Sequence, residues 1–481
     1  MEAPHVVVLP FPAQGHIKPM FMLAKLLSHA GIHISFINTE HTHKLMLQLI
    51  NQSDFHNEYP NFEFISIPDG LPLEHQRTGI SATDLFATTQ AVSKPFFRDL
   101  IGSLRRQGHD KGKGKTTPPP SCIIADGIMS FAVDVAEELN LPVISFRTYN
   151  ATSAWVYFHL EELIQQGELP VTEGDEDMEK LVQCIPALEN TLRRRDLPKI
   201  CRLLETTHPF LQFFIEQAKK MKRASALILN TFQELEAPMV SQLCTIFPKV
   251  YTIGPLHSII KKSLNISNWP SSIEYNNGSL RQEDETCISW LDSQAPRSVL
   301  YVSFGSIVVL TREQILEFWH GLVNSGKPFL WVLRLDGPSG ILDELRLSTS
   351  ERGRITNWAP QEKVLGHASV GGFLTHSGWN STLESIAAGV PMICWPQIAE
   401  QQVNSRCVSE MWNIGLDMKD SCDRLIVEKM VIDLMEDKKE EFAISTERIA
   451  RLASDSIEED GSSYLNIKKL IEDLHEMNHN L

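Results

Sequence analysis

Long apolar runs are missing from this sequence of 481 residues. No uninterrupted hydrophobic stretch approaches the roughly 18 residues that a membrane-spanning helix needs. The N-terminus, MEAPHVVVLPF, lacks the basic segment and the extended apolar segment of a secretory signal peptide. Cysteine is also scarce, because the eight residues are scattered and none forms a C-x-x-C pair. We therefore expect a soluble, cytoplasmic protein with reduced thiols.

Positive charge is in deficit as well, since 44 Lys and Arg stand against 60 Asp and Glu, a formal net charge of −16. The field of such a protein repels nucleic acid and anionic lipid, so any phosphate group must be bound by a local site. Metal-ligand patterns such as H-E-x-x-H, clustered Asp or Cys/His sets are also absent. We expect neither a nucleic-acid partner nor a metal cofactor.

Short β-branched runs alternate with helix-length segments, the pattern of a parallel α/β sheet with helices on its faces. The runs are HVVVLPF, IHISFINT, FEFISIP, CIIAD, PVISF, ALILNTF and VYTIGP, followed in the second half by SVLYVSFGS, PFLWVLR, GRITNWAP, VGGFLTHSG and PMICWP. A chain of this length is too long for one ordinary core. Two doubly wound, Rossmann-like domains in tandem are the simplest architecture.

We place the domain boundaries at changes in composition. Residues 1–256 are expected to form an N-terminal domain and 286–460 a C-terminal domain, with the Ser- and Asn-rich stretch 257–285 as the linker. The amphipathic stretch 461–481 is expected to form a helix that packs back on the N-terminal domain. A P-loop-like segment, GHDKGKGKT at 108–116, has the wrong spacing and precedes three prolines, so we expect a surface loop there.

The stretch THSGWNSTLE indicates a helix whose N-terminus binds an anion. The expected strand VGGFLTH leads into it, and Leu383, Ile386 and Ala387 then repeat at helical spacing until Gly389. We therefore expect the helix to begin near residue 378 or 379. Unpaired N–H groups and the positive end of the helix dipole favour a phosphate at such a position.

Polar side chains around this helix start suit a nucleotide. They are a histidine, an amide, a hydroxyl and, one turn deeper, a carboxylate suited to a ribose diol: His376, Asn380, Ser381 and Glu384. Upstream, Trp358 follows the expected strand GRIT, where its indole offers a stacking surface for a base. The alternative is an ordinary helix, capped by Ser377 or Asn380, with Glu384 in solvent.

A histidine and an aspartate follow two expected strands of the N-terminal domain. His16 lies in FPAQGHIKPM after the first strand, and Asp126 ends the strand of CIIADG. The carboxyl ends of parallel strands share one edge, so the two side chains can meet. Asp126 would then accept the Nδ1–H of His16 and leave Nε2 as a general base for an acceptor hydroxyl. The alternative is that His16 is an inert loop residue.

The block WAPQEKVLGHASVGGFLTHSGWNSTLESIAAGVPMICWPQIAEQQ resembles the signature box of the plant family-one UDP-dependent glycosyltransferases, which opens with Trp and closes with Gln. The stretches FPAQGHIKPM, CIIADG, LRRRDLP, LILNTFQELE, YTIGPL, WLDSQAPRSVLYVSFGS and GSSYLN are also similar to that family, so the resemblance covers essentially the whole chain. It implies a GT-B fold, two doubly wound Rossmann-like domains facing each other across a cleft. Ser377 departs from the family's usual Cys, a small-for-small change that we expect to be tolerated.

The resemblance also implies a reaction, the inverting transfer of glucose from UDP-glucose to give a β-glucoside, with His16 and Asp126 as the catalytic pair. The implied donor residues are Trp358 and Ala359 for the uracil, Gln361 and Glu384 for the ribose, Ser306, His376, Asn380 and Ser381 for the diphosphate, and Trp379, Glu400 and Gln401 for the sugar. Gln401, the last residue of the box, usually accompanies glucose in this family. Hydrogen-bond donors of the site would stabilise the leaving UDP without a metal.

The acceptor is expected in an apolar pocket on the N-terminal side of the cleft. Its candidate residues, each of which is also compatible with plain core, are Phe11, Ile128, Tyr149 and Trp155, with Ile398 from the C-terminal domain. Such a pocket suits a small lipophilic terpenoid or phenolic compound with a hydroxyl or carboxyl group. The N-terminal half resembles the branch of the family that glucosylates terpenoids, including iridoids. Whether the product is an ether glucoside or a glucose ester stays open.

Other functions remain as alternatives. A nicotinamide-dependent oxidoreductase shares the doubly wound fold, but G-x-G-x-x-G is absent after the first expected strand, where PFPAQGHIKP has one glycine. A UDP-sugar or metabolite-binding protein without catalysis is disfavoured by the presence of both His16 and Asp126. Another UDP-sugar, such as UDP-galactose or UDP-xylose, remains an alternative donor. We expect a monomer whose partners are the UDP-sugar and a small-molecule acceptor.

Overall fold

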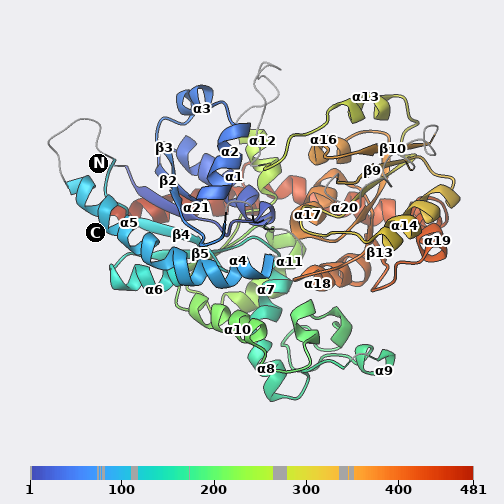
Figure 1. Cartoon of the computed structure of the whole chain (residues 1–481), viewed down its shortest axis with the longest axis horizontal. Coiled ribbons are helices and arrows are strands. Elements are labelled where there is room, and N and C mark those ends of the chain that lie inside the picture. Colours follow the sequence, from blue (N-terminus) through green and yellow to red (C-terminus); the bar gives the residue numbers. More distant parts are fainter. Residues whose placement is uncertain are drawn as a thin grey trace. The chain divides into compact units, whose positions relative to one another are not determined.

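The structure is a computed structural model that describes residues 3–72, 75, 77, 82–109, 117–172, 174–263, 279–334, 345 and 352–479. The chain divides into two compact units. Unit 1 contains residues 1–161, 209–281 and 455–481, and unit 2 contains residues 162–208 and 282–454. Each unit has a single parallel sheet with helices packed around it (Figure 1). The predicted α/β fold with two doubly wound sheets is therefore confirmed.

Unit 1 is built on a seven-stranded sheet in the order β3-β2-β1-β4-β5-β6-β7, and every pair of neighbouring strands is parallel. Its strands are β1 His5–Leu9, β2 His33–Thr39, β3 Phe62–Ile67, β4 Cys122–Asp126, β5 Val143–Arg147, β6 Ala226–Leu229 and β7 Val250–Thr252. All seven correspond to predicted runs. Because the chain moves outward from β1 to β3 and then returns to β4, the order reverses between β1 and β4.

The helices of unit 1 lie on both faces of this sheet, with α1 and α2 on one side and α5, α6 and α10 on the other (Figure 1). They are α1 Gln14–His29, α2 Glu40–Leu49, α3 Gln52–Glu58, α4 Ala82–Thr88, the π-helical η2 Thr89–Ser93, α5 Lys94–His109, α6 Phe131–Glu138, α7 Ala151–Phe158, α10 Pro209–Met221, α11 Gln233–Leu243, α12 Leu256–Ser263 and α21 Ser462–His479. Helix α8, Leu160–Gln165, spans the boundary between the units. Covered on both faces, β1, β4, β5 and β6 are buried throughout.

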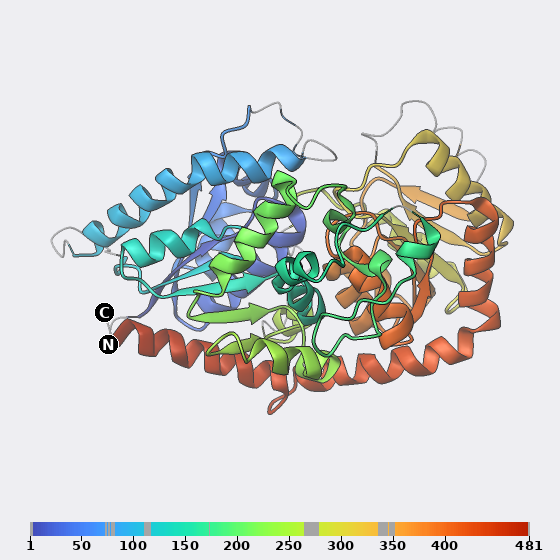
Figure 2. The same ribbon diagram turned by 90° about the horizontal axis from the view of Figure 1, so that it is seen from below.

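Two helices of unit 1 bear on the predicted boundaries. The expected linker 257–285 begins within α12, whose Ile259 and Ile260 are buried in the core. That part of the prediction is wrong, because Leu256, Ile259 and Ile260 form an apolar helical face; residues 264–278 of the stretch lie outside the described residues. Helix α21 packs beside β7 in unit 1 (Figure 2) and buries Leu470 and Leu474 in the same core. Residues 110–116 of the P-loop-like segment also lie outside the described residues.

Unit 2 contains a six-stranded parallel sheet in the order β10-β9-β8-β11-β12-β13. Its strands are β8 Val299–Ser303, β9 Phe329–Val332, β10 Gly353–Thr356, β11 Val370–Thr375, β12 Met392–Cys394 and β13 Gly415–Asp417. Five of them correspond to predicted runs, but β13 was not predicted. Its three residues contain one large apolar side chain, which is too little for a recognisable pattern.

The helical segments of unit 2 are α9 Asp175–Met178, η3 Arg194–Asp196, η4 Lys199–Arg202, α13 Thr286–Asp292, α14 Arg312–Asn324, α16 Gln361–Leu365, α17 Trp379–Ala388, α18 Gln401–Arg406, η6 Cys407–Met411, α19 Arg424–Ile432 and η7 Asp433–Asp437, with α20 Lys439–Ser456 reaching the boundary with unit 1. Here η3 and η4 are 3₁₀ turns, and η6 and η7 are π-helical. Among the described residues, none of these helices, nor any in unit 1, is long and apolar enough to cross a membrane.

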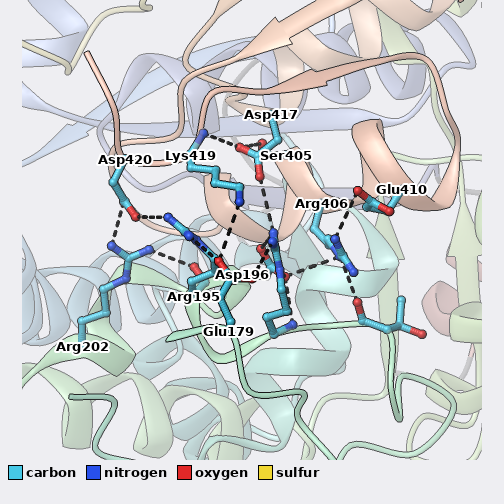
Figure 3. A network of polar contacts seen from close by, with 12 residues as sticks. Glu179, Arg195, Asp196, Arg202, Ser405, Arg406, Glu410, Asp417, Lys419 and Asp420 are labelled. Atoms are coloured by element: carbon cyan, nitrogen blue, oxygen red, sulfur yellow. Dashed lines mark hydrogen bonds and ion pairs between the residues drawn. The ribbon is translucent and has the colours of Figure 1, made fainter. Parts of the chain in front are cut away.

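Residues 162–208 belong to unit 2 although they lie within the predicted N-terminal domain 1–256. Ion pairs attach this segment to the region around β13 (Figure 3). Asp420 accepts hydrogen bonds from Arg195 at 2.9 Å and from Arg202 at 2.8 Å, and Asp196 lies 3.5 Å from Arg406. The boundary predicted from sequence order therefore differs from the boundary in the structure.

Candidate active site

The reversal of strand order in unit 1 places two polar side chains at one edge of the sheet. His16 is the third residue of α1, directly after β1, and Asp126 is the last residue of β4. β1 and β4 are neighbours that run in the same direction. Ligands of open α/β sheets bind outside the carboxyl ends of the strands at this kind of switch point.

His16 and Asp126 are in direct contact. The Nδ1 atom of His16 lies 2.7 Å from Oδ2 of Asp126, and Oδ1 of the same carboxylate accepts the backbone N–H of Ile128 at 2.9 Å. The Asp126 side chain is 1% exposed, whereas that of His16 is 20% exposed. A carboxylate can only accept, so the hydrogen bond assigns the proton to Nδ1 and makes Nε2 the basic ring nitrogen. The sequence did not indicate Thr148, whose hydroxyl lies 3.1 Å from the same Nδ1.

Aromatic and aliphatic side chains surround this pair within unit 1. Phe11 contacts the His16 ring edge-on, with centroids 5.2 Å apart, and stacks on Phe86 at 4.7 Å. The backbone N–H of Ile128 donates a hydrogen bond to Asp126, and its carbonyl accepts a hydrogen bond from the Gln90 side chain at 3.1 Å. Two of the four predicted pocket residues of this unit, Phe11 and Ile128, therefore adjoin the His–Asp pair, and Phe86 and Gln90 join them.

The other three predicted pocket residues have different neighbours among the contacts of the structure. Tyr149 is buried and its ring stacks beside Arg147, at 5.0 Å from the guanidinium carbon. Trp155 is buried in α7 against His159, with ring centroids 4.2 Å apart. Ile398 belongs to unit 2, where it is 36% exposed in the loop before α18.

In unit 2, helix α17 begins at Trp379 and ends before Gly389, which has a left-handed φ of 67°. The predicted start and end are therefore confirmed. Its N-cap is Gly378, which has no side chain to cap the helix. The alternative cap, Ser377, has a φ of 63°, and its carbonyl accepts from Asn404 at 2.9 Å. The N-cap residue of α17 thus leaves the first-turn N–H groups to other partners, and an anion suits such a helix start.

Two glycines make room for the imidazole of His376. A Cβ at Gly305, in the loop after β8, or at Gly378 would collide with Nε2 of His376. Burial lowers the pKa of His376 to about 4; a hydrogen bond to the Ser303 backbone opposes this shift, and the charge of Arg334 adds to it. The ring is therefore neutral near pH 7 and carries a single N–H.

Three predicted donor residues form one hydrogen-bonded cluster. Nε2 of Gln361 donates to Oε2 of Glu384 at 2.7 Å and to the hydroxyl of Ser381 at 2.9 Å. Glu384 is 3% exposed, so the alternative that places it in solvent is wrong. Tyr301, which the sequence did not indicate, donates its hydroxyl to Oε1 of Gln361 at 3.2 Å. The cluster lies where α16 packs on α17.

The residues predicted for the base follow β10. Trp358 is half-buried, and its carbonyl accepts the N–H of Asp284 at 2.8 Å. Asp284 in turn accepts the hydroxyl of Thr356 at 2.8 Å, which fixes this loop to the strand. Ala359 is buried. In the loop after β8, the carbonyl of Ser306 accepts from Arg334.

The residues predicted for the sugar lie at the starts of α17 and α18. Gln401 uses its own side-chain oxygen to bind the N–H groups of Gln397 at 2.8 Å and Ile398 at 2.9 Å. This closes a tight loop in which Ala399 has a φ of 53° and Glu400 is half-buried. Trp379 is buried beside Trp412, with ring centroids 6.2 Å apart, and Asn380 is half-buried next to it. Gln401 thus shapes the loop that carries Glu400.

Within the described ranges, no three His, Cys, Asp or Glu side chains are grouped as metal ligands would be. The polar groups assembled in the two units are instead a histidine–aspartate pair in unit 1 and a set of hydrogen-bond donors and a buried carboxylate around α17 in unit 2.

Comparisons with known proteins agree on one family. A profile of the family described as UDP-glucoronosyl and UDP-glucosyl transferase matches residues 122–446. A 7-deoxyloganetic acid glucosyltransferase of Catharanthus roseus is 47% identical over 476 residues, which are 98% of this chain and 97% of the relative. A 7-deoxyloganetin glucosyltransferase of the same plant is 39% identical over 482 residues, 98% and 96% of the two chains. The crystal structure of Os79 from O. sativa in complex with UDP has a TM-score of 0.80 and 28% identity, and the match covers 98% of this chain and 100% of Os79.

Proposed function

Since this chain belongs to the UDP-glucoronosyl and UDP-glucosyl transferase family and is a UDP-glycosyltransferase of the GT-B fold, we propose that it transfers glucose from UDP-glucose to a small terpenoid and forms a β-glucoside. The observation that carries the proposal is the His16–Asp126 pair, which is a general base at the switch point of a ligand-binding sheet. The relatives named for 7-deoxyloganetic acid and 7-deoxyloganetin support an iridoid acceptor.

His16 acts as the general base. Its Nε2 removes the proton of the acceptor hydroxyl as the oxygen attacks the anomeric carbon of glucose. Asp126 holds the ring by the 2.7 Å hydrogen bond to Nδ1 and stabilises the imidazolium as the proton arrives. The bond between the anomeric carbon and the β-phosphate oxygen breaks in the same step. A single displacement of this kind inverts an α-linked donor to a β-glucoside.

The donor is held by unit 2. Gln361 and Glu384 bind the ribose hydroxyls, since the buried Glu384 carboxylate accepts hydrogen bonds from a diol. The N–H groups at the start of α17, beside the neutral His376, donate to the diphosphate and stabilise the charge that develops on UDP. Trp358 stacks on the uracil, and Glu400 and Gln401 position the sugar. In this mechanism hydrogen-bond donors supply the stabilisation that a metal gives in other transferases.

The proposal is tested by UDP release from UDP-glucose in the presence of EDTA, with 7-deoxyloganetic acid as acceptor. We expect acceptor-dependent release that is unaffected by the chelator. His16→Ala should lower kcat by about 10³-fold or more, because it removes the general base and the two residues of the pair act as a unit. Asp126→Asn should also lower kcat. If EDTA abolishes release, the metal-free mechanism is wrong; if His16→Ala matches the wild type, the base is misassigned.

We further propose that the enzyme works in the cytoplasm as a monomer. The scattered cysteines of the sequence support a reducing compartment. Light scattering after size-exclusion chromatography should give the mass of one 54.3 kDa chain; a mass twice as large would contradict the monomer.

A further inference from the structure

Arg147, the last residue of β5, is a buried cation that is hydrogen-bonded to no residue in the described part of the chain. Arg147 is 1% exposed. None of the three nitrogens of its side chain, Nε, Nη1 and Nη2, has a hydrogen-bond partner among the described residues. A guanidinium stays protonated and carries five N–H donors. Arginine is almost never fully buried unless it is paired, because an unpaired buried charge is strongly unfavourable.

The surroundings of Arg147 accommodate the cation without neutralising it. The guanidinium carbon lies 5.0 Å from the ring centroid of Tyr149 and 5.9 Å from that of Tyr157, so aromatic faces provide partial electrostatic compensation. Gly127 follows Asp126 in the chain, and a Cβ there would lie 2.7 Å from Nε of Arg147. The absence of a side chain at residue 127 is therefore what allows the guanidinium to lie at this position.

The buried carboxylates of this part of unit 1 are already engaged. Asp126 accepts from His16 and from the N–H of Ile128. Glu236 accepts four hydrogen bonds, from the backbone of Ala151, the backbone and hydroxyl of Thr152, and the hydroxyl of Thr231. Neither acid bonds to Arg147, so the charge is available to an anion from outside the chain.

Arg147 is linked to the catalytic pair by the chain and by aromatic contacts. Thr148, the next residue, places its hydroxyl 3.1 Å from Nδ1 of His16. A series of ring contacts also runs from His16 to the rings beside Arg147, with centroid distances of 5.2, 4.7, 5.8 and 5.6 Å along His16, Phe11, Phe86, Phe214 and Tyr157. The result is an apolar, aromatic region with a base at one end and a cation at the other.

We propose that Arg147 binds a carboxylate of the acceptor, separate from the hydroxyl that receives glucose. This proposal rests on the proposed function and specifies its substrate class: a hydroxy acid of terpenoid size, with an apolar body for the aromatic region. Arginine matches a carboxylate through two parallel N–H···O bonds, which are strong where water is excluded. An ester of the same acid offers no negative charge and gains little from Arg147.

The carboxylate must displace part of the covering of the guanidinium, since its nitrogens are shielded from solvent. Met221 is one side chain that can yield, because its sulfur and Nε of Arg147 both border Gly127, where a Cβ would lie 2.6 Å from the sulfur, and a thioether chain has many accessible rotamers. A carboxylate held by two hydrogen bonds at Arg147 is not available to His16. The product is therefore a glucoside formed on a hydroxyl, with the carboxylate left free, and not a glucose ester.

The test compares kcat/KM for 7-deoxyloganetic acid and for its methyl ester in the wild type, Arg147→Met and Arg147→Lys. We expect the wild type to prefer the acid, and Arg147→Met to lower kcat/KM for the acid by about 10- to 100-fold, mostly through KM, the range of a charged hydrogen-bonded pair. Activity on the ester should change by less than about threefold, and Arg147→Lys should keep part of the preference. The acid product should retain a titratable carboxylate.

Arg105 provides the matched control. It is a partly buried cation of the same unit that donates to the carbonyl of Leu139 at 2.6 Å, and Arg105→Met should leave the ratio of acid to ester unchanged. An unchanged ratio in Arg147→Met, or equal losses on acid and ester, would overturn the carboxylate site and make Arg147 a structural residue. If Arg147→Met does not fold, the absence of any wild-type preference for the acid overturns the proposal equally well.

Failure of the proposed function gives a different result. In that case no acceptor stimulates UDP release, whereas the carboxylate site is still tested by calorimetric binding of the acid and the ester to the wild type and Arg147→Lys. Tighter binding of the acid that weakens in Arg147→Lys supports the site; equal binding of acid and ester overturns it.

Discussion

Replacing Asp196 with alanine should destabilise unit 2 by about 3–5 kcal/mol, the cost of breaking a buried ion pair. Asp196 lies among the charged side chains that join segment 162–208 to the rest of the unit (Figure 3). Its Oδ2 accepts the backbone N–H and Nε of Arg193, both at 2.8 Å, and its Oδ1 accepts Nη2 at 2.7 Å. Arg406 lies 3.5 Å from the same carboxylate.

The magnitude follows from burial. The side chain of Asp196 is 4% exposed, and those of Arg193 and Arg406 are 12% and 13% exposed, so the substitution removes the most buried partner of two cations. Each cation keeps a more exposed carboxylate, Glu179 at 3.1 Å and Glu410 at 3.3 Å. Asp417 compensates as well. Burial raises the pKa of Asp417, and the charge of Asp196 raises it further. Without Asp196, the Asp417 carboxylate lies 3.6 Å from Arg193 and ionises more readily, which favours the lower end of the range.

Asp420→Ala is the control for this prediction. Asp420 accepts from Arg195 and Arg202 with equally good geometry, but its side chain is 39% exposed. Solvent-exposed ion pairs contribute about 0–1 kcal/mol, so this variant should lose no more than that. Urea unfolding followed by circular dichroism measures the free energy of unfolding of both variants. In thermal unfolding, a unit of this size should shift its Tm by about 2–4 °C per kcal/mol. Equal losses in the two variants would refute the reasoning from burial.

Two further predictions concern the donor residues. Glu384→Ala should raise KM for UDP-glucose by about 10- to 100-fold, the cost of leaving buried hydrogen-bonding groups unpaired, and should change kcat much less; an unchanged KM would remove Glu384 from the ribose site. For His376, the folded pKa of about 4 lies below the unfolded value of 6.5, so the unfolded chain binds the extra proton between these pH values. The unfolding free energy of the ligand-free protein should therefore fall by about 1.4 kcal/mol per pH unit as pH drops from 6.5 towards 4. His376→Asn should lose this part of the pH dependence, and the same slope in both proteins would contradict it.

The sheets could be predicted from the sequence because buried parallel strands are local, continuous apolar runs. HVVVL became β1 and CIIAD became β4, and the reversal between them placed His16 beside Asp126. Strand β13 was not predicted because its sequence, GLD, contains only one large apolar side chain. The linker prediction began too early and so took in α12, because Ile259 and Ile260 belong to a helical face only one turn long.

The donor site was predictable where its signal is local and less so where it is tertiary. The start of α17 follows from the spacing of Leu383, Ile386 and Gly389, and the structure has it there. The cluster of Gln361, Ser381 and Glu384 joins residues 20 and 23 positions apart, and only the family resemblance indicated Gln361. Thr148 and Arg147 were missed, since nothing in PVISFRT distinguishes a hydroxyl near the base or a cation without a partner from ordinary strand-end residues.

The predicted N-terminal domain 1–256 included residues 162–208, which belong to unit 2 in the structure. This segment matters for function because it contacts the predicted sugar loop. Lys199 donates its backbone N–H to the carbonyl of Ala399 at 3.2 Å, and Arg406, at the end of α18, donates to the carbonyl of Thr191 at 2.9 Å. Ala399 is the residue with a left-handed φ in the loop that Gln401 closes. The loop predicted to hold the sugar is thus supported from both ends of α18 by a segment about 200 residues earlier in the chain. Long-range ion pairs such as that between Arg195 and Asp420 fix this segment, and no local sequence pattern encodes them, which is why a boundary drawn from composition assigns it to the wrong unit.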